Sequence, residues 1–302
     1  ASDVYKRQIL YEAPLMLEKS HFSEVVCREL NLKTKPIDLT EWRKMVENIK
    51  NRPYCINIGL VGKYTQLHDA YLSVAEALRH AGYVYNAHIK IHWIDSETLN
   101  EESADDVLGK LDGIIVPGGF GDRGVEGMIC AAKYARENDL PYFGICLGMQ
   151  VAVIEYARNV LGLRDANSGE FDEACPHKVI DFMPGQSDEV DKGGTLRLGA
   201  YPCIIKPDTV LEKLYGSTEI SERHRHRYEF NNDYRKQYED AGLTLAGTSP
   251  DGRLIETIEL SDRPFFVGVQ YHPEFGSRPN RAHPLFKGFI RAAFDHSKEG
   301  IL

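Results

Sequence analysis

The chain has 302 residues, of which 42% are hydrophobic and 27% are charged, and its formal net charge is −9. These proportions are typical of a folded globular protein and exclude a chain that is disordered throughout. The acidic balance argues against a general nucleic-acid binder and against binding to anionic membranes, because both functions need cationic surfaces that neutralise phosphate groups.

Two further features of the composition bear on the cellular setting. Apolar runs stay shorter than about 18 residues, the length that predicts a membrane-spanning helix. The six cysteines are scattered without C-x-x-C pairs, so they indicate neither a zinc site nor a disulfide framework. We therefore expect a cytoplasmic protein without a metal site and without contact with a membrane.

Residues 9–52 are predicted to be helical. A helix start is marked at Asp38, which as N-cap forms a capping box with Glu41 three residues later. Ile37 and Trp42 flank this start and can pack against each other as a hydrophobic staple. The apolar residues that follow recur on one face of the helix, so this face needs a partner to lie on.

From Pro53 onwards, short apolar strands alternate with helices. Strands are predicted at residues 55–61, 88–94, 113–116 and 142–145, and helices at residues 70–81, 103–110, 125–137 and 151–161. The alternation predicts a doubly wound three-layer α/β/α sandwich with a mostly parallel central sheet, which binds ligands at the carboxyl ends of its strands. We accordingly divide the chain into an N-terminal helical linker, residues 1–52, and a main domain, residues 53–302.

The second half of the main domain is richer in strands. They are predicted at residues 178–182, 196–205, 228–231, 243–248, 254–260 and 266–271, before a closing helix at residues 284–296. Residues 184–194 are rich in Gly, Asp and Ser and are predicted to form a mobile surface loop.

Cys146 is the first candidate for chemistry. It lies between a predicted strand and a predicted helix, in a G-x-C-x-G sequence with Gly144 and Gly148. At such a junction this sequence is the sulfur version of the nucleophile elbow, in which glycines leave room for a strained turn. The N-terminus of the following helix favours the thiolate over the thiol. We therefore predict that Cys146 is a nucleophile.

A cysteine nucleophile needs an imidazole that exchanges protons with it and a third group that orients the imidazole. His272 follows the last predicted strand, and Glu274 lies two residues further on, with Pro273 fixing the turn between them. We therefore predict a catalytic triad of Cys146, His272 and Glu274, whose members meet only in the fold.

A glycine-rich loop follows the predicted strand at residues 113–116. It lacks the Gly-Lys-Ser/Thr sequence of a phosphate-binding loop, so phosphate binding is the less favoured interpretation. The interpretation that we favour is an oxyanion hole, formed beside the sulfur by the backbone N–H groups of Gly119 and Leu147.

Three motifs resemble those of class I glutamine amidotransferases, and they come in the same order along the chain. They are Pro117-Gly-Gly119, Gly144-Ile-Cys-Leu-Gly-Met-Gln150 and His272-Pro-Glu274. Further segments are each similar to segments of the CTP synthase family, and together they span residues 55 to 295. These segments are residues 62–78, 119–127, 165–170 and 222–229.

The resemblance implies a glutaminase, which hydrolyses L-glutamine to glutamate and ammonia through a cysteinyl thioester. It also implies the residues that hold glutamine, namely Gly119, Phe120, Leu147, Gly148, Met149, Gln150, Glu170 and Arg227. Arg227 would bind the α-carboxylate of glutamine as a fork, and Glu170 would accept hydrogen bonds from its α-ammonium group. Phe120 would serve as a lid or a packing wall.

In the CTP synthase family, the ammonia aminates UTP to CTP in an N-terminal amidoligase domain, which uses ATP and Mg. The sequence G-x-x-x-x-G-K-S/T does not occur in this chain, so we expect it neither to bind ATP and UTP nor to make CTP by itself. The resemblance therefore implies the glutaminase half of a glutamine-hydrolysing CTP synthase, a ligase. It further implies an amidoligase domain as partner, GTP as an allosteric activator, and a homo-oligomer at full length.

Other interpretations stay open at this point. The elbow could belong to a different class I amidotransferase or to a γ-glutamyl hydrolase, and the chain could be a non-catalytic oligomerisation module, although an intact triad argues against an inert scaffold. His224 and His226 share one face of an extended segment whose other face carries arginines. A metal site there would need a third ligand that is not evident from the sequence, so we predict none.

Overall fold

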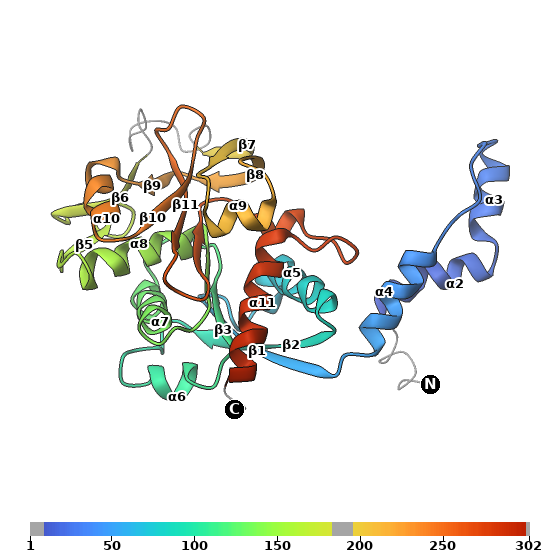
Figure 1. The fold of residues 1–302 in the computed structure, drawn as a ribbon, viewed down its shortest axis with the longest axis horizontal. Helices are drawn as coiled ribbons and strands as arrows, with labels where there is room; N and C mark the ends of the chain where they lie inside the picture. The colour runs from blue at the N-terminus through green and yellow to red at the C-terminus, as the bar shows by residue number, and fades with distance from the viewer. Residues whose placement is uncertain (1–8, 183–195, 300–302) are drawn as a thin grey trace.

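The computed structural model describes residues 9–182 and 196–299. Within these residues, one sheet of nine strands runs through the body of the molecule in the order β2-β1-β3-β4-β12-β11-β10-β7-β8 (Figure 1). The surface loop predicted at residues 184–194 lies outside the described residues.

The first five strands of this order are all parallel to one another. They are β2 (Ala87–Asp95), β1 (Tyr54–Gly62), β3 (Gly113–Val116), β4 (Tyr142–Ile145) and β12 (Phe266–Val269). Every residue of β3, β4 and β12 is buried, as expected for parallel strands that are covered on both faces. These strands form the parallel core of the predicted central sheet.

The other four strands extend the sheet in antiparallel fashion. They are β11 (Ile255–Leu260), β10 (Thr244–Thr248), β7 (Arg197–Ile205) and β8 (Glu219–His226). A separate small sheet contains β5 (Ala166–Ser168), β6 (His177–Phe182) and β9 (Tyr228–Phe230). Strand β8 is not among the predicted strands, but the predicted extended segment is confirmed, since its histidines are buried and its arginines exposed.

Helices cover both faces of the sheet and complete the three layers. On one face, α7 (Val125–Glu137) and α8 (Leu147–Asn159) enclose one hydrophobic cluster, and on the other, α5 (Leu72–Val84) and α11 (Pro284–Glu299) enclose a second. This arrangement confirms the predicted doubly wound sandwich. The short helices are α6 (Ala104–Leu108), α9 (Val210–Tyr215) and α10 (Arg235–Asp240), with 3₁₀ turns η2 (His68–Tyr71), η3 (Asn232–Tyr234) and η4 (Pro273–Gly276). None of the described helices is long and apolar enough to cross a membrane.

The N-terminal segment contains η1 (Leu10–Glu12), α2 (Ala13–Lys19), α3 (Phe22–Glu29) and α4 (Thr40–Lys50). Figure 1 shows α2 and α3 reaching away from the body. The segment is anchored through Tyr11, whose hydroxyl donates to Glu76 of α5 at 3.0 Å and whose carbonyl accepts from Trp42 of α4 at 2.7 Å. The segment is therefore helical, as expected, whereas the domain boundary at residue 53 stays a prediction.

The predicted capping box at Asp38 is wrong. Helix α4 begins at Thr40, and Asp38 Oδ1 accepts hydrogen bonds from the backbone N–H and the hydroxyl of Thr40, at 2.9 and 2.6 Å. The carboxylate of Asp38 is thus held in a local turn by Thr40 and does not cap the helix. Ile37 is 53% exposed, so the staple does not bury it either.

Helix α7 rests directly on the backbone that follows β2, and this contact generates a prediction about stability. A Cβ atom on Gly127 would lie 1.9 Å from the carbonyl oxygen of Ser96. We expect Gly127→Ala to lower the free energy of unfolding by about 1–3 kcal/mol, because the helix must move to relieve the overlap. Urea unfolding measures the change. Glu126→Ala on the exposed side of α7 is the control, and equal stability of the two variants would contradict the prediction.

Candidate active site

Cys146 occupies the tight turn between β4 and α8, with φ of 53° and ψ of −101°. This strained backbone conformation is typical of functional sites and needs support from its surroundings. The N–H of Cys146 donates to the carbonyl of Val269 at 2.7 Å. A Cβ atom on Gly144 would lie 2.5 Å from the carbonyl carbon of Gly148, so glycine is what lets the turn close. The structure thus has the elbow that the G-x-C-x-G sequence predicts.

His272 and Glu274 reach the same place from β12, the parallel neighbour of β4. Because parallel strands end at the same edge of a sheet, the residues that follow them are brought together. His272 Nδ1 lies 2.8 Å from Glu274 Oε1, and the N–H of His272 donates to the carbonyl of Arg223 at 2.7 Å. The ring is therefore held from two sides, by a carboxylate and through its own backbone.

The electrostatics of this pair favour a charged imidazole. Burial lowers the pKa of His272, but hydrogen bonds and charge interactions with Cys146 and Glu274 outweigh burial and raise the pKa to about 10. An imidazolium beside a cysteine favours the thiolate. The imidazolium, with Glu274 against its Nδ1 atom, is therefore the favoured form of His272.

The glycine-rich loop after β3 lies against this pair. A Cβ atom on Gly118 would lie 2.9 Å from His272 Cε1 and 3.5 Å from Cys146 Cβ, so a larger residue would push the imidazole from its place. Gly119 lies next to it, with its Cα facing Leu147 and Lys63. Both residues predicted to form the oxyanion hole therefore adjoin Cys146.

A cavity of about 200 Å³ opens on Cys146 and gathers most of the residues predicted to hold glutamine. Its lining includes Gly119, Phe120, Gln150, Glu170 and Arg227. A carboxylate and a guanidinium in one small cavity match the opposite charges of a free amino acid.

The other predicted contacts lie behind this cavity. Leu147 and Met149 are fully buried in the core, and Gly148 packs its Cα against the carbonyl of Val116. None of the three lines the cavity. Any contact that they make with glutamine would be through the backbone at the start of α8, and it stays a prediction.

The glycine-rich loop is fastened from two sides. Glu170 Oε1 accepts from the N–H of Gly121 at 2.8 Å, and Lys63 Nζ donates to the carbonyls of Phe120, at 3.0 Å, and of Gly121. Burial lowers the pKa of Lys63. Lys63 is not among the predicted site residues, although it directly follows β1 and lies in the segment of residues 62–78 that resembles the CTP synthase family.

Gln270 is a second residue that the prediction did not include. It is fully buried, one residue past β12, and its Nε2 atom lies 3.6 Å from Cys146 Sγ. A polar side chain between an apolar strand and His272 was the signal that could have found it.

A larger cavity, of about 320 Å³, adjoins Cys146, His272 and Glu274. Arg223 and Arg225 of β8 contribute to its lining, and their guanidinium groups lie over the rings of Phe275 and Phe120, at 5.8 and 5.6 Å from the ring centres. Cys146 therefore lies where the two cavities meet.

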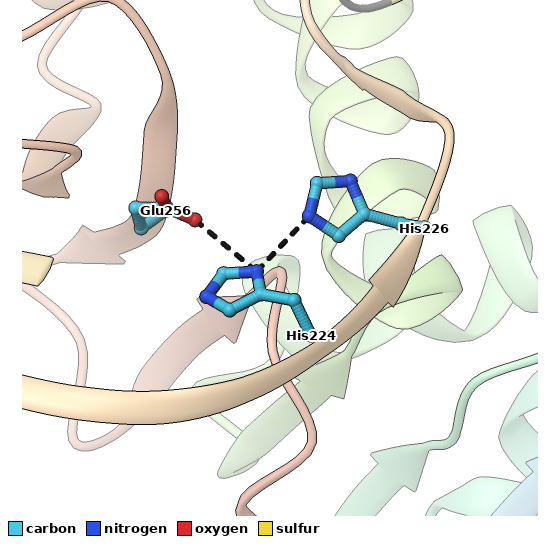
Figure 2. A group of neighbouring side chains, drawn as sticks. All are labelled: His224, His226 and Glu256. Carbon is cyan, nitrogen blue, oxygen red and sulfur yellow. Dashed lines mark hydrogen bonds and ion pairs between the residues drawn. The ribbon is translucent and has the colours of Figure 1, made fainter. Parts of the chain in front are cut away.

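The histidines of β8 have a carboxylate neighbour that the sequence did not reveal. His224 Nδ1 lies 3.0 Å from His226 Nε2 and 3.6 Å from Glu256 Oε2, and all three residues are buried (Figure 2). Burial and the charge of Arg197 lower the pKa of His224 to about 2 and that of His226 to about 3, so both rings are neutral.

These three residues could offer ligand atoms to a cation, but their surroundings oppose one. Arg197 is itself buried and already pairs with Glu256. A divalent ion would therefore add charge beside a guanidinium in a medium of low dielectric constant, with one carboxylate to balance both. A hydrogen bond between two neutral imidazoles, beside the ion pair of Arg197 and Glu256, is the better account of this cluster.

The sequence matches the family described as glutamine amidotransferase class-I over residues 66–292. Curated relatives include the CTP synthase of Ruminiclostridium cellulolyticum, 56% identical over 289 residues, and that of Carboxydothermus hydrogenoformans, 57% identical over 289 residues. Each of these alignments covers 96% of this chain and 54% of the relative. The chain thus spans about half the length of the curated relatives that it matches.

A solved structure is also similar, the glutaminase domain of Trypanosoma brucei CTPS with bound acivicin. It is 41% identical, with a TM-score of 0.75, and the match covers 80% of this chain and 94% of that one. With the elbow, the histidine and carboxylate pair and the amino-acid-sized cavity already in place, these matches lead to one conclusion. The chain belongs to the class I glutamine amidotransferases and is homologous to the glutaminase domain of CTP synthases.

Proposed function

We propose that this chain hydrolyses L-glutamine to glutamate and ammonia through a thioester on Cys146. The observation that carries the proposal is the position of the His272 and Glu274 pair beside a buried cysteine that opens on a cavity with Glu170 and Arg227. Nucleophile, proton carrier and amino-acid clamp then occupy one site.

The first half of the reaction releases ammonia. The Cys146 thiolate attacks the side-chain amide carbon, and the backbone N–H groups of Gly119 and Leu147 stabilise the oxyanion. The His272 imidazolium gives its proton to the amide nitrogen, ammonia leaves, and a glutamyl thioester remains. Glu274 holds the ring in the orientation that this transfer needs.

The second half of the reaction regenerates the thiolate of Cys146. Neutral His272 takes a proton from water, the hydroxide attacks the thioester carbon, and glutamate leaves as the thiolate re-forms. The site thus returns to its thiolate and imidazolium state without a cofactor of its own.

Substrate recognition follows from the smaller cavity. Arg227 binds the α-carboxylate of glutamine and Glu170 its α-ammonium group, so that only the amide end reaches the sulfur. Phe120, whose side chain is 52% exposed at the mouth of the site, covers the bound substrate.

The similarity to CTP synthases supports a proposal about the product. The ammonia would aminate UTP to CTP in an amidoligase domain that binds ATP and Mg, with GTP as an allosteric activator. The whole enzyme would then be a cytoplasmic, homo-oligomeric ligase with glutamine as its amido donor. Assaying glutamine against γ-glutamyl peptides tests the alternative of a γ-glutamyl hydrolase.

Replacement of the nucleophile tests the chemistry. We expect Cys146→Ala to reduce ammonia release from glutamine by at least about a thousand-fold, because no other group forms the thioester. An enzyme-coupled ammonia assay measures the loss. Cys55→Ala, at an exposed position outside the site, should keep full turnover. Retained glutaminase activity in Cys146→Ala would refute the proposal.

Replacement of the clamp tests substrate recognition. We expect Glu170→Gln to raise KM for glutamine about ten-fold or more, because a hydrogen bond from the substrate ammonium group loses its charged acceptor. Steady-state kinetics measure KM and kcat, with Glu173→Gln, at an exposed position nearby, as the control. An unchanged KM would remove Glu170 from the clamp.

The raised pKa of His272 predicts a pH dependence. Cys146 and the carboxylate of Glu274 both favour the imidazolium, so the proton donor should be lost only as the pH rises towards about 10. In Glu274→Gln the pKa of His272 should fall, and the basic limb of the kcat/KM profile should move to lower pH. A basic limb at the same pH in both proteins would show that Glu274 does not set this pKa.

A further inference from the structure

We propose that Gln270 is a further catalytic residue, whose side-chain N–H donates to the sulfur of Cys146 and stabilises the thiolate. Its Nε2 atom lies 3.6 Å from Sγ, a distance at which an N–H group reaches the large sulfur atom. Gln270 is fully buried, so water does not compete for this hydrogen bond. Hydrogen bonds to a charged acceptor are about twice as strong as those between neutral groups.

The orientation of the Gln270 amide is fixed by its neighbour Gln150. Gln150 Nε2 donates to Gln270 Oε1 at 3.2 Å and to the carbonyl of Tyr228 at 3.0 Å. Because a backbone carbonyl only accepts, the nitrogen of Gln150 must face Tyr228. Gln270 therefore presents its oxygen to Gln150 and its nitrogen to the sulfur. The flipped amide would oppose nitrogen to nitrogen at one end and oxygen to thiolate at the other.

From the carbonyl of Tyr228, the hydrogen bonds continue to the buried histidines of β8. His226 Nδ1 lies 3.2 Å from the carbonyl of Tyr228, so this nitrogen carries the proton and Nε2 is an acceptor. His224 Nδ1, 3.0 Å away, must then donate to it, and Glu256 Oε2 lies 3.6 Å from the same nitrogen (Figure 2). When both imidazoles are neutral, this placement of their protons is the one that satisfies both hydrogen bonds. The cluster thus anchors the Tyr228 carbonyl that orients Gln150.

The side-chain amides of Gln270 and Gln150 and the carbonyl of Tyr228 therefore connect the sulfur to the buried histidines by a chain of hydrogen bonds. Gln270 adds a directed donor to the two other groups that favour the thiolate, which are the N-terminus of α8 and His272. The inference concerns the protonation of the sulfur and is independent of the substrate, so it can fail while the glutaminase proposal stands.

The rate of alkylation of Cys146 by iodoacetamide, followed against pH by peptide mass spectrometry, tests the inference. The thiolate displaces iodide from the reagent, so the profile reports the apparent pKa of the thiol. We expect Gln270→Met, which keeps the size but removes the donor, to raise this pKa by about one to two units. Below both pKa values, alkylation of Cys146 should then be about ten- to a hundred-fold slower.

Two controls separate this effect from a loss of packing. Thr257→Val removes a buried hydroxyl from the neighbouring strand β11 and should leave the profile of Cys146 unchanged. Alkylation of Cys55, which is exposed, should be the same in every variant. A folded Gln270→Met protein with the parental profile of Cys146 would overturn the proposal.

A second measurement covers the case in which Gln270→Met does not fold. In the unmodified chain, labelled with ¹⁵N in its glutamine side chains, one buried amide group should shift with the same pH midpoint as the alkylation of Cys146. Glutamine amide signals that are all unaffected by this titration would equally overturn the proposal.

Discussion

Strands β4 and β12 lie side by side and run in the same direction, and the site depends on this pairing. Their register places Val269 opposite Ile145, so both strands end at one edge of the sheet. The residues that follow are Cys146 on one strand and Gln270 and His272 on the other. Gly268 keeps the pairing close to α8, because a Cβ atom there would press on Met149 at 3.1 Å. The position of Cys146 beside Gln270 and His272 is thus a consequence of how two buried strands pack.

Charge is distributed unevenly around this edge. The chain as a whole is acidic, with a net charge of −9, yet β8 and the residue after it bring three arginines to the site. Arg227 lines the smaller cavity together with Glu170, whereas Arg223 and Arg225 line the larger one. The local cations suit a substrate that carries a carboxylate, and Glu170 suits the ammonium group of the same molecule. The residues proposed to bind the substrate and those proposed to react with it therefore line two adjoining cavities.

The parts of the site that could be predicted are those coded by short segments. Cys146 was marked by its flanking glycines, and the pair of His272 and Glu274 by the turn around Pro273. Lys63 and Gln270 could not be placed in the same way, because their roles arise from contacts that depend on the order of the strands. Pairing between distant strands also brings Glu256 to the histidines, so no local pattern revealed it.

In the fold, too, short segments predict some features, whereas others depend on contacts between distant strands. The alternation of strands and helices predicted the layers and the parallel core, because each unit buries its own apolar residues. The antiparallel extension depends on pairing between distant segments. The alternation of histidine and arginine in β8 therefore indicates an extended segment but not its place in the sheet. At Asp38, the hydroxyl of Thr40 donates to the carboxylate that the capping box needs. The predicted helix cap therefore did not form, although the sequence matched its pattern.

The central claim is that the sulfur of Cys146 lies within reach of a bound glutamine side chain. Incubation with a glutamine analogue that carries an electrophilic side chain, followed by mass spectrometry of the peptides, tests it most directly. The account predicts one adduct per chain, on Cys146, formed more slowly when glutamine is present. Adducts spread over several cysteines, or a rate on Cys146 that glutamine does not change, would contradict it.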